Sequence, residues 1–174
     1  LVTSRGSITG LSTGFHELDR MTNGLHEGEM FVIAARPSMG KTALAMNIAE
    51  HVALDGDKPV AVFSLEMSAQ QLVQRLLCSR ARVNSKNLRD GFIGKNDLNS
   101  ISSNAAILAK AKIFVDDTPG LSILELRAKA RRLHNREKIQ LVVSDYLQLL
   151  RSNSRRAQDN RQIEIQEISY GIKA

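Results

Sequence analysis

The strongest candidate for chemistry is the segment from residue 35 to residue 42, which reads ARPSMGKT. An apolar run precedes it and apolar residues at helical spacing follow it, which is the strand–loop–helix context of a phosphate-binding loop. In such a loop, backbone N–H groups and the positive end of the helix dipole attract phosphate oxygens. Gly40 allows close approach of the backbone, Lys41 supplies a positive charge to the β- and γ-phosphates, and Thr42 offers its hydroxyl to Mg²⁺.

Ala35 replaces the first glycine of the general phosphate-loop pattern, and a small residue still suits the turn if its φ is negative. The alternative is an incidental Gly-Lys-Thr at a helix start, which the flanking strand and helix argue against. We therefore expect nucleotide phosphates to be bound by the loop and the first helical residues, namely Ala35, Arg36, Pro37, Ser38, Met39, Gly40, Lys41, Thr42 and Ala43.

Two carboxylates follow apolar runs and are candidates for the same site. Asp145 follows residues 141–144, and a strand ending there would bring its carboxylate into reach of the Mg²⁺ shell. A strand-ending Asp is commonly just a turn residue, but the phosphate loop upstream favours the metal role. Glu66 follows residues 60–65 and could orient and deprotonate the attacking water. It could equally stabilise the following helix by about 0.5 kcal/mol, and spacing alone does not separate these readings.

Other polar residues in strand-like runs have simpler interpretations. Asp116 and Asp117 also end an apolar run and could approach the site, but we interpret them as turn residues before Thr118-Pro119-Gly120. Ser144 interrupts the aliphatic run before Asp145, and we expect it to hydrogen-bond to a neighbouring strand.

The elements that must position these residues alternate along the chain. Apolar runs predict strands at residues 30–34, 60–65, 113–115 and 141–144. Helical spacing and capping boxes that start at Ser68 and Ser122 predict helices between them, over residues 15–21, 41–54, from 69, 96–111, 122–135 and 161–174. Alternating strands and helices indicate an α/β fold with a parallel sheet, in which ligands bind beyond the carboxyl ends of the strands.

Composition bounds the class of protein. The chain has 174 residues, of which 43% are hydrophobic and only 4% aromatic, so we expect one domain with an aliphatic core. No apolar run approaches the roughly 20 residues that cross a bilayer, so we expect no membrane partner. The single Cys78 fits a reducing cytoplasm and is interpreted as a small buried hydrophobe.

The net charge of +6 is compatible with a polyanionic partner but is weak evidence for one. The four histidines match no metal-ligand spacing, so no zinc site is predicted.

Several segments together resemble the DnaB family of hexameric replicative helicases, which have a RecA-like P-loop ATPase domain. The matching segments are residues 13–19 (TGFHELD), 35–42 (ARPSMGKT), 63–67 (FSLEM), 114–117 (FVDD) and 145–149 (DYLQL). They follow the family's order and cover nearly the whole chain, and three of them jointly (ARPSMGKT, FSLEM and DYLQL) are specific. Ala35 is typical of this family, whereas Ser144 departs from it because an aliphatic residue is usual there.

The resemblance implies a role for each candidate residue. Lys41 and Thr42 match the Walker A lysine and threonine, Asp145 matches the Walker B aspartate, and Glu66 matches the catalytic glutamate. The implied catalytic residues are thus Glu66 and Lys41, the metal residues are Thr42 and Asp145, and the cofactors are ATP and Mg²⁺. The implied partners are single-stranded DNA, a primase, a helicase loader and five further copies of the chain in a homo-hexamer.

The same resemblance predicts the domain organisation. We expect residues 1–9 to form a linker and residues 10–174 to form part of a RecA-like motor domain that is incomplete at its C-terminal end. The γ-phosphate sensor, the DNA-binding loops and the arginine finger are expected beyond residue 174. Since a trans arginine is commonly worth roughly 10³-fold or more in phosphoryl transfer, this chain alone should hydrolyse ATP weakly.

Three functions are compatible with the loop: two are ATPases, and the third differs in class. The leading hypothesis is an ATP-driven DNA helicase. A RecA-type recombinase or repair ATPase would share the phosphate loop, but FSLEM and DYLQL argue against it. A nucleotide-binding assembly module, in which ATP is structural, would need no water-activating base, so Glu66 argues against that reading.

Overall fold

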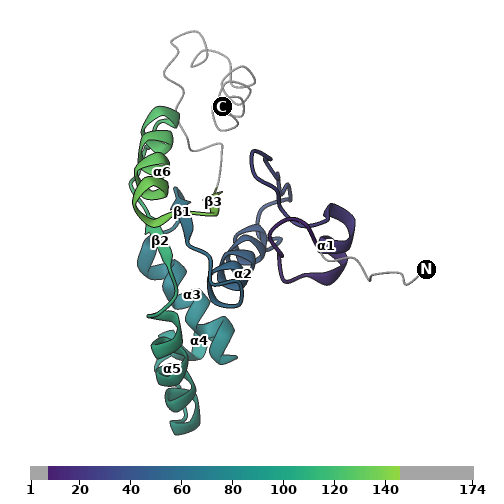
Figure 1. Ribbon diagram of the computed structural model, residues 1–174. Coiled ribbons are helices and arrows are strands. Elements are labelled where there is room, and N and C mark those ends of the chain that lie inside the picture. The colour runs from purple at the N-terminus through teal and green to yellow at the C-terminus, as the bar shows by residue number, and fades with distance from the viewer. Residues whose placement is uncertain (1–7, 146–174) are drawn as a thin grey trace, which may run out of the picture.

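Within residues 8–145, a three-stranded parallel sheet lies between layers of helices (Figure 1). The structure is a computed structural model that describes residues 8–145. The strands are β1 (Val60–Ser64), β2 (Ile113–Asp116) and β3 (Leu141–Asp145), in the order β2-β1-β3. Val60 pairs with Ile113 on one side and with Leu141 on the other, so all three strands run from the same edge of the sheet. Their carboxyl ends therefore meet at one edge, where an α/β protein places its ligands.

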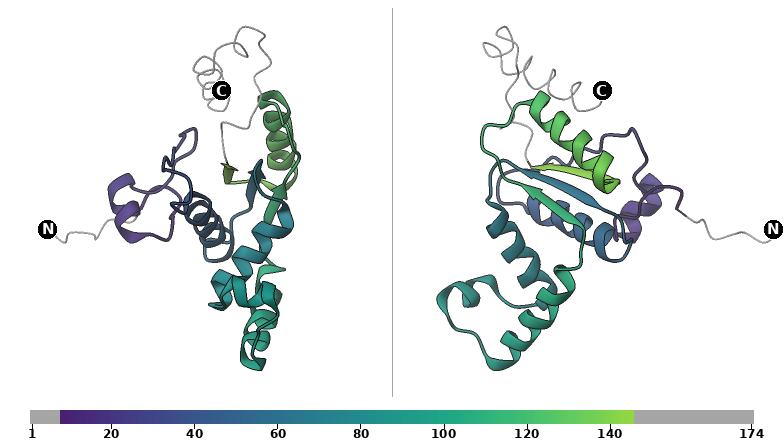
Figure 2. Two further views of the ribbon diagram at one scale, coloured as in Figure 1. Left: turned by 180° about the vertical axis from the view of Figure 1, so that it is seen from behind. Right: turned by 60° about the vertical axis from the view of Figure 1, so that its left-hand side comes forward.

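The central strand β1 supplies the core on both faces of the sheet. All five of its residues are buried, and successive side chains point to opposite faces. Val60 and Val62 pack with α2 (Lys41–Leu54) and α3 (Ala69–Ala81), whereas Ala61 and Phe63 pack with α6 (Ile123–Glu137). Figure 2 shows α6 on the opposite side of the sheet from α2. The predicted α/β class, with a parallel sheet flanked by helices, is confirmed.

Local side-chain hydrogen bonds set the starts of two helices. Ser68 accepts a hydrogen bond from the Gln71 backbone N–H, and the Gln71 side chain accepts one from the Ser68 N–H. Ser122 and Glu125 form the same reciprocal pair at the start of α6. Each pair satisfies two backbone donors that a helix leaves unpaired, so both predicted capping boxes are confirmed.

The remaining helices of the described residues are α1 (His16–Thr22), α4 (Ser85–Asp90) and α5 (Lys95–Leu108). The prediction for α2 is confirmed at both ends, and those for α1, α5 and α6 are confirmed within three residues. The sequence did not predict α4. It is a single short polar helix, whose start is capped by the Asn84 side chain accepting from the Lys86 N–H.

The strand predicted at residues 30–34 is wrong for the described part of the chain, because no segment of residues 8–145 forms a ladder with it. A strand exists only where a neighbour accepts and donates its backbone hydrogen bonds, and an apolar run does not guarantee that neighbour. Phe31 and Val32 are 49% and 57% exposed, unlike the residues of β1. The helix predicted at residues 161–174 lies outside the described residues.

Residues 8–27 form a small lobe built around a buried carboxylate. Leu11 and Leu25 form an antiparallel bridge that closes the lobe. Asp19, on α1, is 2% exposed and accepts hydrogen bonds from the Thr13 N–H at 2.8 Å, the Thr13 hydroxyl at 2.7 Å and the Ser12 hydroxyl at 2.7 Å. Burial raises the pKa of Asp19, but the hydrogen bonds from Thr13, Ser12 and Gly14 outweigh burial and hold the pKa below its ordinary value.

This lobe is joined to α2 through His51. The Ser12 hydroxyl lies 3.2 Å from Nε2 of His51, and Nδ1 of His51 lies 2.8 Å from the Asp55 carboxylate. Gly14 has φ +81°, and a Cβ there would lie 2.7 Å from the His51 ring, so only glycine lets the lobe approach α2 this closely.

Asp19→Ala is expected to destabilise the lobe by about 1–3 kcal/mol, because it leaves the buried Thr13 N–H and hydroxyl without an acceptor. Since the folded pKa of Asp19 is lowered, this stabilisation is present above the ordinary carboxyl pKa and is lost as pH falls through the folded value. Thermal unfolding and hydrogen exchange over residues 11–26 of the full-length protein at pH 7 would measure the loss. The control is Glu17→Ala, whose side chain is 77% exposed and whose removal should change stability by less than about 0.5 kcal/mol. Equal effects of the two changes would contradict the prediction.

Two further features of residues 8–145 bear on the sequence predictions. Cys78 is 4% exposed and burial raises the pKa of its thiol, which confirms its interpretation as a buried apolar residue. No helix in this part of the chain has the length and apolar character needed to span a membrane.

Candidate nucleotide-binding site

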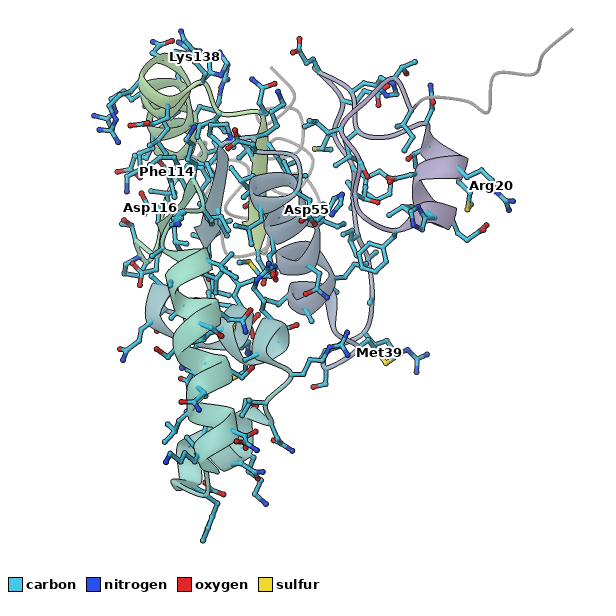
Figure 3. The ribbon with its side chains drawn as sticks, turned by 60° about the horizontal axis from the view of Figure 1, so that its bottom comes forward. Arg20, Met39, Asp55, Phe114, Asp116 and Lys138 are labelled. Carbon is cyan, nitrogen blue, oxygen red and sulfur yellow. The ribbon has the colours of Figure 1, made fainter. Side chains whose placement is uncertain are left out.

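The candidate phosphate loop is an exposed turn that ends at the start of α2. Ala35 to Gly40 form the exposed loop, and Lys41, Thr42 and Ala43 form the first turn of the helix. The Met39 N–H donates to the Arg36 carbonyl at 3.3 Å, and the Met39 side chain, 72% exposed, projects from the outside of the turn (Figure 3). The loop is therefore held by its own backbone, with its outer face open to solvent.

The backbone conformation at the end of the loop suits an anion. Ser38 and Gly40 have φ of +64° and +88°, and residues in this left-handed region turn neighbouring N–H groups toward a common concavity. Among residues 8–145, no side chain caps the start of α2, in contrast to α3 and α6. A Cβ placed on Gly40 would meet no heavy atom of the described residues within 4 Å, so these residues leave open space beside the positive end of the helix. A phosphate group placed there would receive backbone hydrogen bonds and the favourable helix dipole.

The first turn of α2 contacts the carboxyl end of β3 directly. The Thr42 hydroxyl donates to Oδ2 of Asp145 at 2.5 Å, across 103 positions in the sequence. Asp145 is the last residue of β3 and only 9% exposed. The structure thus brings together a hydroxyl and a carboxylate that sequence analysis selected separately.

The loop that carries Glu66 lies beside the same strand end. Ser64 pairs with Asp145 in the sheet, and the next residue, Leu65, donates its N–H to the Asp145 carbonyl at 2.8 Å. The Glu66 side chain is exposed at this edge. Parallel pairing of β1 and β3 therefore gathers Thr42, Glu66 and Asp145 at the carboxyl edge of the sheet.

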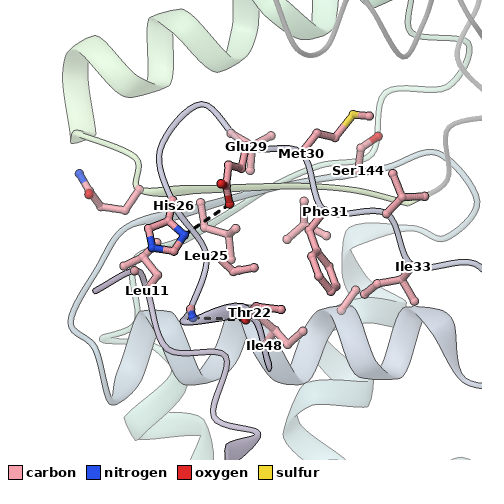
Figure 4. A pocket seen from close by; sticks show the side chains of 18 of the residues that line it. Leu11, Thr22, Leu25, His26, Glu29, Met30, Phe31, Ile33, Ile48 and Ser144 are labelled. Carbon is pink, nitrogen blue, oxygen red and sulfur yellow. Dashed lines mark hydrogen bonds and ion pairs between the residues drawn. The ribbon is translucent and has the colours of Figure 1, made fainter. Parts of the chain in front are cut away.

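A cavity of about 1120 Å³ extends from this edge along β3 (Figure 4). Residues from Gln140 to Asp145 form one wall, residues 24–35 form the opposite wall, and Lys41, Ala45 and Ile48 of α2 also line it. Most of the lining is apolar, and the phosphate loop reaches the cavity only through Ala35 and Lys41. The cavity lies between residues 30–34 and β3, so β3 is not a strand neighbour of that segment. The phosphate site is therefore defined by the loop and Asp145 rather than by the bulk of the cavity.

Ser144 lines this cavity and differs from its prediction. Its Oγ is buried and has no hydrogen-bond partner within residues 8–145, so the expected bond to a neighbouring strand is absent there. The reason is geometric: the Ser144 side chain lies on the cavity wall (Figure 4), whereas the neighbouring strand β1 pairs with β3 through backbone groups.

The two aspartates at the end of β2 have different contacts. Asp116 accepts from the Thr118 N–H and hydroxyl at 3.0 and 2.6 Å and forms an ion pair with Lys129 at 2.6 Å, consistent with the predicted turn. Burial raises the pKa of Asp116, but Lys129 and Thr118 outweigh burial and hold the pKa below its ordinary value. Asp117 instead accepts from the Ala69 N–H at 2.8 Å. Nothing in the spacing of these residues indicated that contact, because they are 48 positions apart.

A parallel α/β sheet, a Gly-Lys-Thr loop that opens a helix, and a strand-ending aspartate against the loop threonine together define a P-loop nucleotide-binding protein. The comparisons with known proteins agree. The chain belongs to the family of the DnaB-like helicase C terminal domain, whose sequence profile matches residues 10–174.

Two curated relatives illustrate the similarity. The chain is 47% identical over 170 residues to the replicative DNA helicase DnaC of Bacillus subtilis (strain 168), covering 98% of this chain and 37% of that protein. It is 48% identical over 169 residues to the replicative DNA helicase DnaB of Geobacillus stearothermophilus, covering 97% and 37%. The chain thus spans 37% of the length of each of these two relatives.

Two solved structures share the fold. One is a DnaB-like replicative helicase described with its interactions with primase, with a TM-score of 0.89 and 33% identity over 98% of this chain and 41% of that chain. The other is the ATPase domain of G40P, with a TM-score of 0.88 and 34% identity over 98% and 60%. The predicted RecA-like fold and the resemblance to the DnaB family are confirmed.

Proposed function

We propose that this chain is part of the motor of a replicative DNA helicase, in which ATP hydrolysis is coupled to translocation on single-stranded DNA and to duplex unwinding. The observation that carries the proposal is the contact between Thr42 and Asp145 beside the phosphate loop. P-loop enzymes use a threonine hydroxyl and a strand-ending aspartate to hold the metal of a nucleotide, so this contact supports the proposal. Relatives named replicative DNA helicases, of which the chain matches 37%, support the choice of activity.

The binding roles follow from the position of each residue. We assign binding of the nucleotide phosphates to residues Ala35 through Ala43. Backbone N–H groups of the loop donate hydrogen bonds to the phosphate oxygens, and the positive end of the α2 dipole attracts them. Lys41 supplies the cationic charge for the β- and γ-phosphates. Lys41 and Asp145 both line the cavity beside β3.

The donor set fits Mg²⁺. Thr42 and Asp145 present two oxygen atoms, and residues 8–145 hold no group of three His, Cys, Asp or Glu side chains that could bind an ion alone. Mg²⁺ characteristically uses one or two protein oxygens and takes its other ligands from phosphates and water, so this sparse set suits it. When bound, the ion neutralises charge on the phosphate oxygens. Thr42 and Asp145 would hold it next to the loop.

We assign the general base to Glu66. Its loop is hydrogen-bonded to the end of β3 through Leu65, which supports a position for Glu66 at the carboxyl edge of the sheet, beside the phosphate loop. An exposed carboxylate can accept a proton from water and orient the water at the same time. A general base is needed for hydrolysis but not for nucleotide binding, so this assignment makes the chain part of an ATPase and not only a nucleotide-binding module.

The larger assembly extends the proposal. We place residues 1–9 in a linker and residues 10–174 in a RecA-like motor domain of a homo-hexameric ring in the cytoplasm, with single-stranded DNA, a primase and a helicase loader as partners. One structural relative is described with its interactions with primase. In such a ring a neighbouring subunit supplies an arginine, so the chain alone should bind ATP better than it hydrolyses ATP.

The full-length protein is expected to unwind a forked duplex with Mg·ATP and not with a non-hydrolysable analogue. A gel or fluorescence assay of strand release measures this activity. Strand exchange without unwinding would favour a recombinase. Assembly that depends on nucleotide binding, without hydrolysis or unwinding, would favour an assembly module. Either result would overturn the helicase proposal.

A further inference from the structure

The short loop that carries Glu66 is tied to its surroundings at both ends. On the strand side, the buried Ser64 hydroxyl donates to the Met67 carbonyl at 2.6 Å and accepts from the Met67 N–H at 3.2 Å. The Leu65 N–H donates to the Asp145 carbonyl at 2.8 Å. These contacts hold the first half of the loop against β1 and β3.

The other end of the loop is the start of α3, and its tie to the sheet is Asp117. Ala69 is the first residue of α3, and its N–H donates to Oδ2 of Asp117 at 2.8 Å. Asp116 pairs with Phe63 of β1, so Asp117 lies one residue beyond the paired end of β2. The carboxylate thus bridges the carboxyl end of one strand and the helix that follows the neighbouring strand.

This hydrogen bond differs in kind from the capping box at the same helix end. Ser68 and Gln71 bond to each other's backbone N–H, so their contacts lie within residues 68–71 and tie α3 to nothing else. Asp117 satisfies a separate donor, the Ala69 N–H, from a distant element. A carboxylate at a helix N-terminus is further stabilised by the helix dipole. Asp117 therefore links the start of α3 to the end of β2, whereas the contacts of the capping box lie within α3 and its cap.

We propose that Asp117 is a positioning residue for ATP hydrolysis, which acts by holding the Glu66 loop in place through Ala69. The inference rests on the proposed role of Glu66 as general base. Ala69 is three positions from Glu66, so a shift of the helix start moves the carboxylate of the base. Asp117 acts through the backbone and not on the nucleotide, so its loss affects turnover and leaves binding at the phosphate loop intact. A displacement of about 1 Å at a reacting group can cost up to about 10²-fold in rate.

The test is DNA-stimulated ATP turnover by the full-length protein. Asp117→Ala is expected to lower kcat about tenfold, with the KM for ATP and the Kd for a non-hydrolysable nucleotide unchanged within about twofold. Asp117→Asn keeps an oxygen that can accept from the Ala69 N–H and is expected to retain turnover within about twofold. The matched control is Ser68→Ala, which removes a cap from the same helix but leaves the tie to β2, and should also stay within about twofold.

Several results would overturn the role of Asp117. They are wild-type kcat in Asp117→Ala, an equal fall of kcat in Ser68→Ala, and a joint loss of turnover and nucleotide affinity in Asp117→Ala. A fall in Asp117→Asn as large as in Asp117→Ala would also do so, because the negative charge rather than the hydrogen bond would then matter. Glu66→Gln is measured in parallel. Unchanged turnover in Glu66→Gln would show that the base assignment itself had failed, whatever Asp117 did.

Discussion

Replacing Glu66 by glutamine is expected to lower DNA-stimulated ATP turnover of the full-length protein by about 10²–10⁴-fold, the usual contribution of a positioned general base. Glutamine keeps the size and a hydrogen-bonding oxygen of the side chain but cannot accept the proton of the attacking water. The backbone contacts of the loop, from Leu65 to Asp145 and from Ser64 to Met67, do not involve the Glu66 side chain and should persist. Steady-state phosphate release at saturating ATP measures the effect.

Nucleotide affinity distinguishes loss of the base from loss of the site. In Glu66→Gln, the Kd for Mg·ATP should stay within about threefold of wild type, because Lys41, Thr42 and Asp145 are unchanged. The control is Glu17→Gln, on the exposed face of α1, which should alter neither turnover nor affinity. Near-normal turnover in Glu66→Gln would refute the assignment and favour its alternative role as a charge at the start of α3.

Lys41→Ala is expected to weaken binding of Mg·ATP by about 10- to 100-fold, because a charge-assisted hydrogen bond is worth about 1.5–3 kcal/mol and each 1.4 kcal/mol is a factor of ten. The lysine begins α2, and the dipole of that helix already favours an anion at this position. The backbone N–H donors of the loop remain in this variant, so we expect it still to bind Mg·ATP weakly. Isothermal calorimetry on the full-length protein, with and without Mg²⁺, measures the change.

The matched control for this experiment is Lys58→Ala. Lys58 is exposed and lies just before the amino end of β1, at the opposite edge of the sheet from Asp145. The Lys58→Ala change removes the same charge from the protein without altering the phosphate loop, so the Kd of this variant for Mg·ATP should equal that of wild type. Equal binding by Lys41→Ala and wild type would refute the loop as the phosphate site. Equal losses in the two lysine variants would indicate an effect of net charge instead.

Features that depend on near neighbours in the chain were predictable from the sequence. The capping boxes at Ser68 and Ser122 and the extent of α2 were predicted and confirmed, because hydrogen bonds within three or four residues and a 3.6-residue apolar period determine them. The phosphate loop was recognisable for the same reason, since its glycine, lysine and threonine are consecutive. The role of Glu66 was not determined by spacing, and only the resemblance to a family favoured catalysis over helix stabilisation.

Features that depend on distant partners were decided by the tertiary structure. Residues 30–34 have the composition of a strand, but strand formation needs a neighbour, and a cavity separates them from β3. The sequence suggested that Asp145 could approach the loop, yet the 2.5 Å contact with Thr42 depends on the parallel register that aligns β3 with β1. The bond from Ala69 to Asp117 had no sequence signal at all. Local physics therefore selected the reactive residues, and the order and register of the strands determined which of them meet.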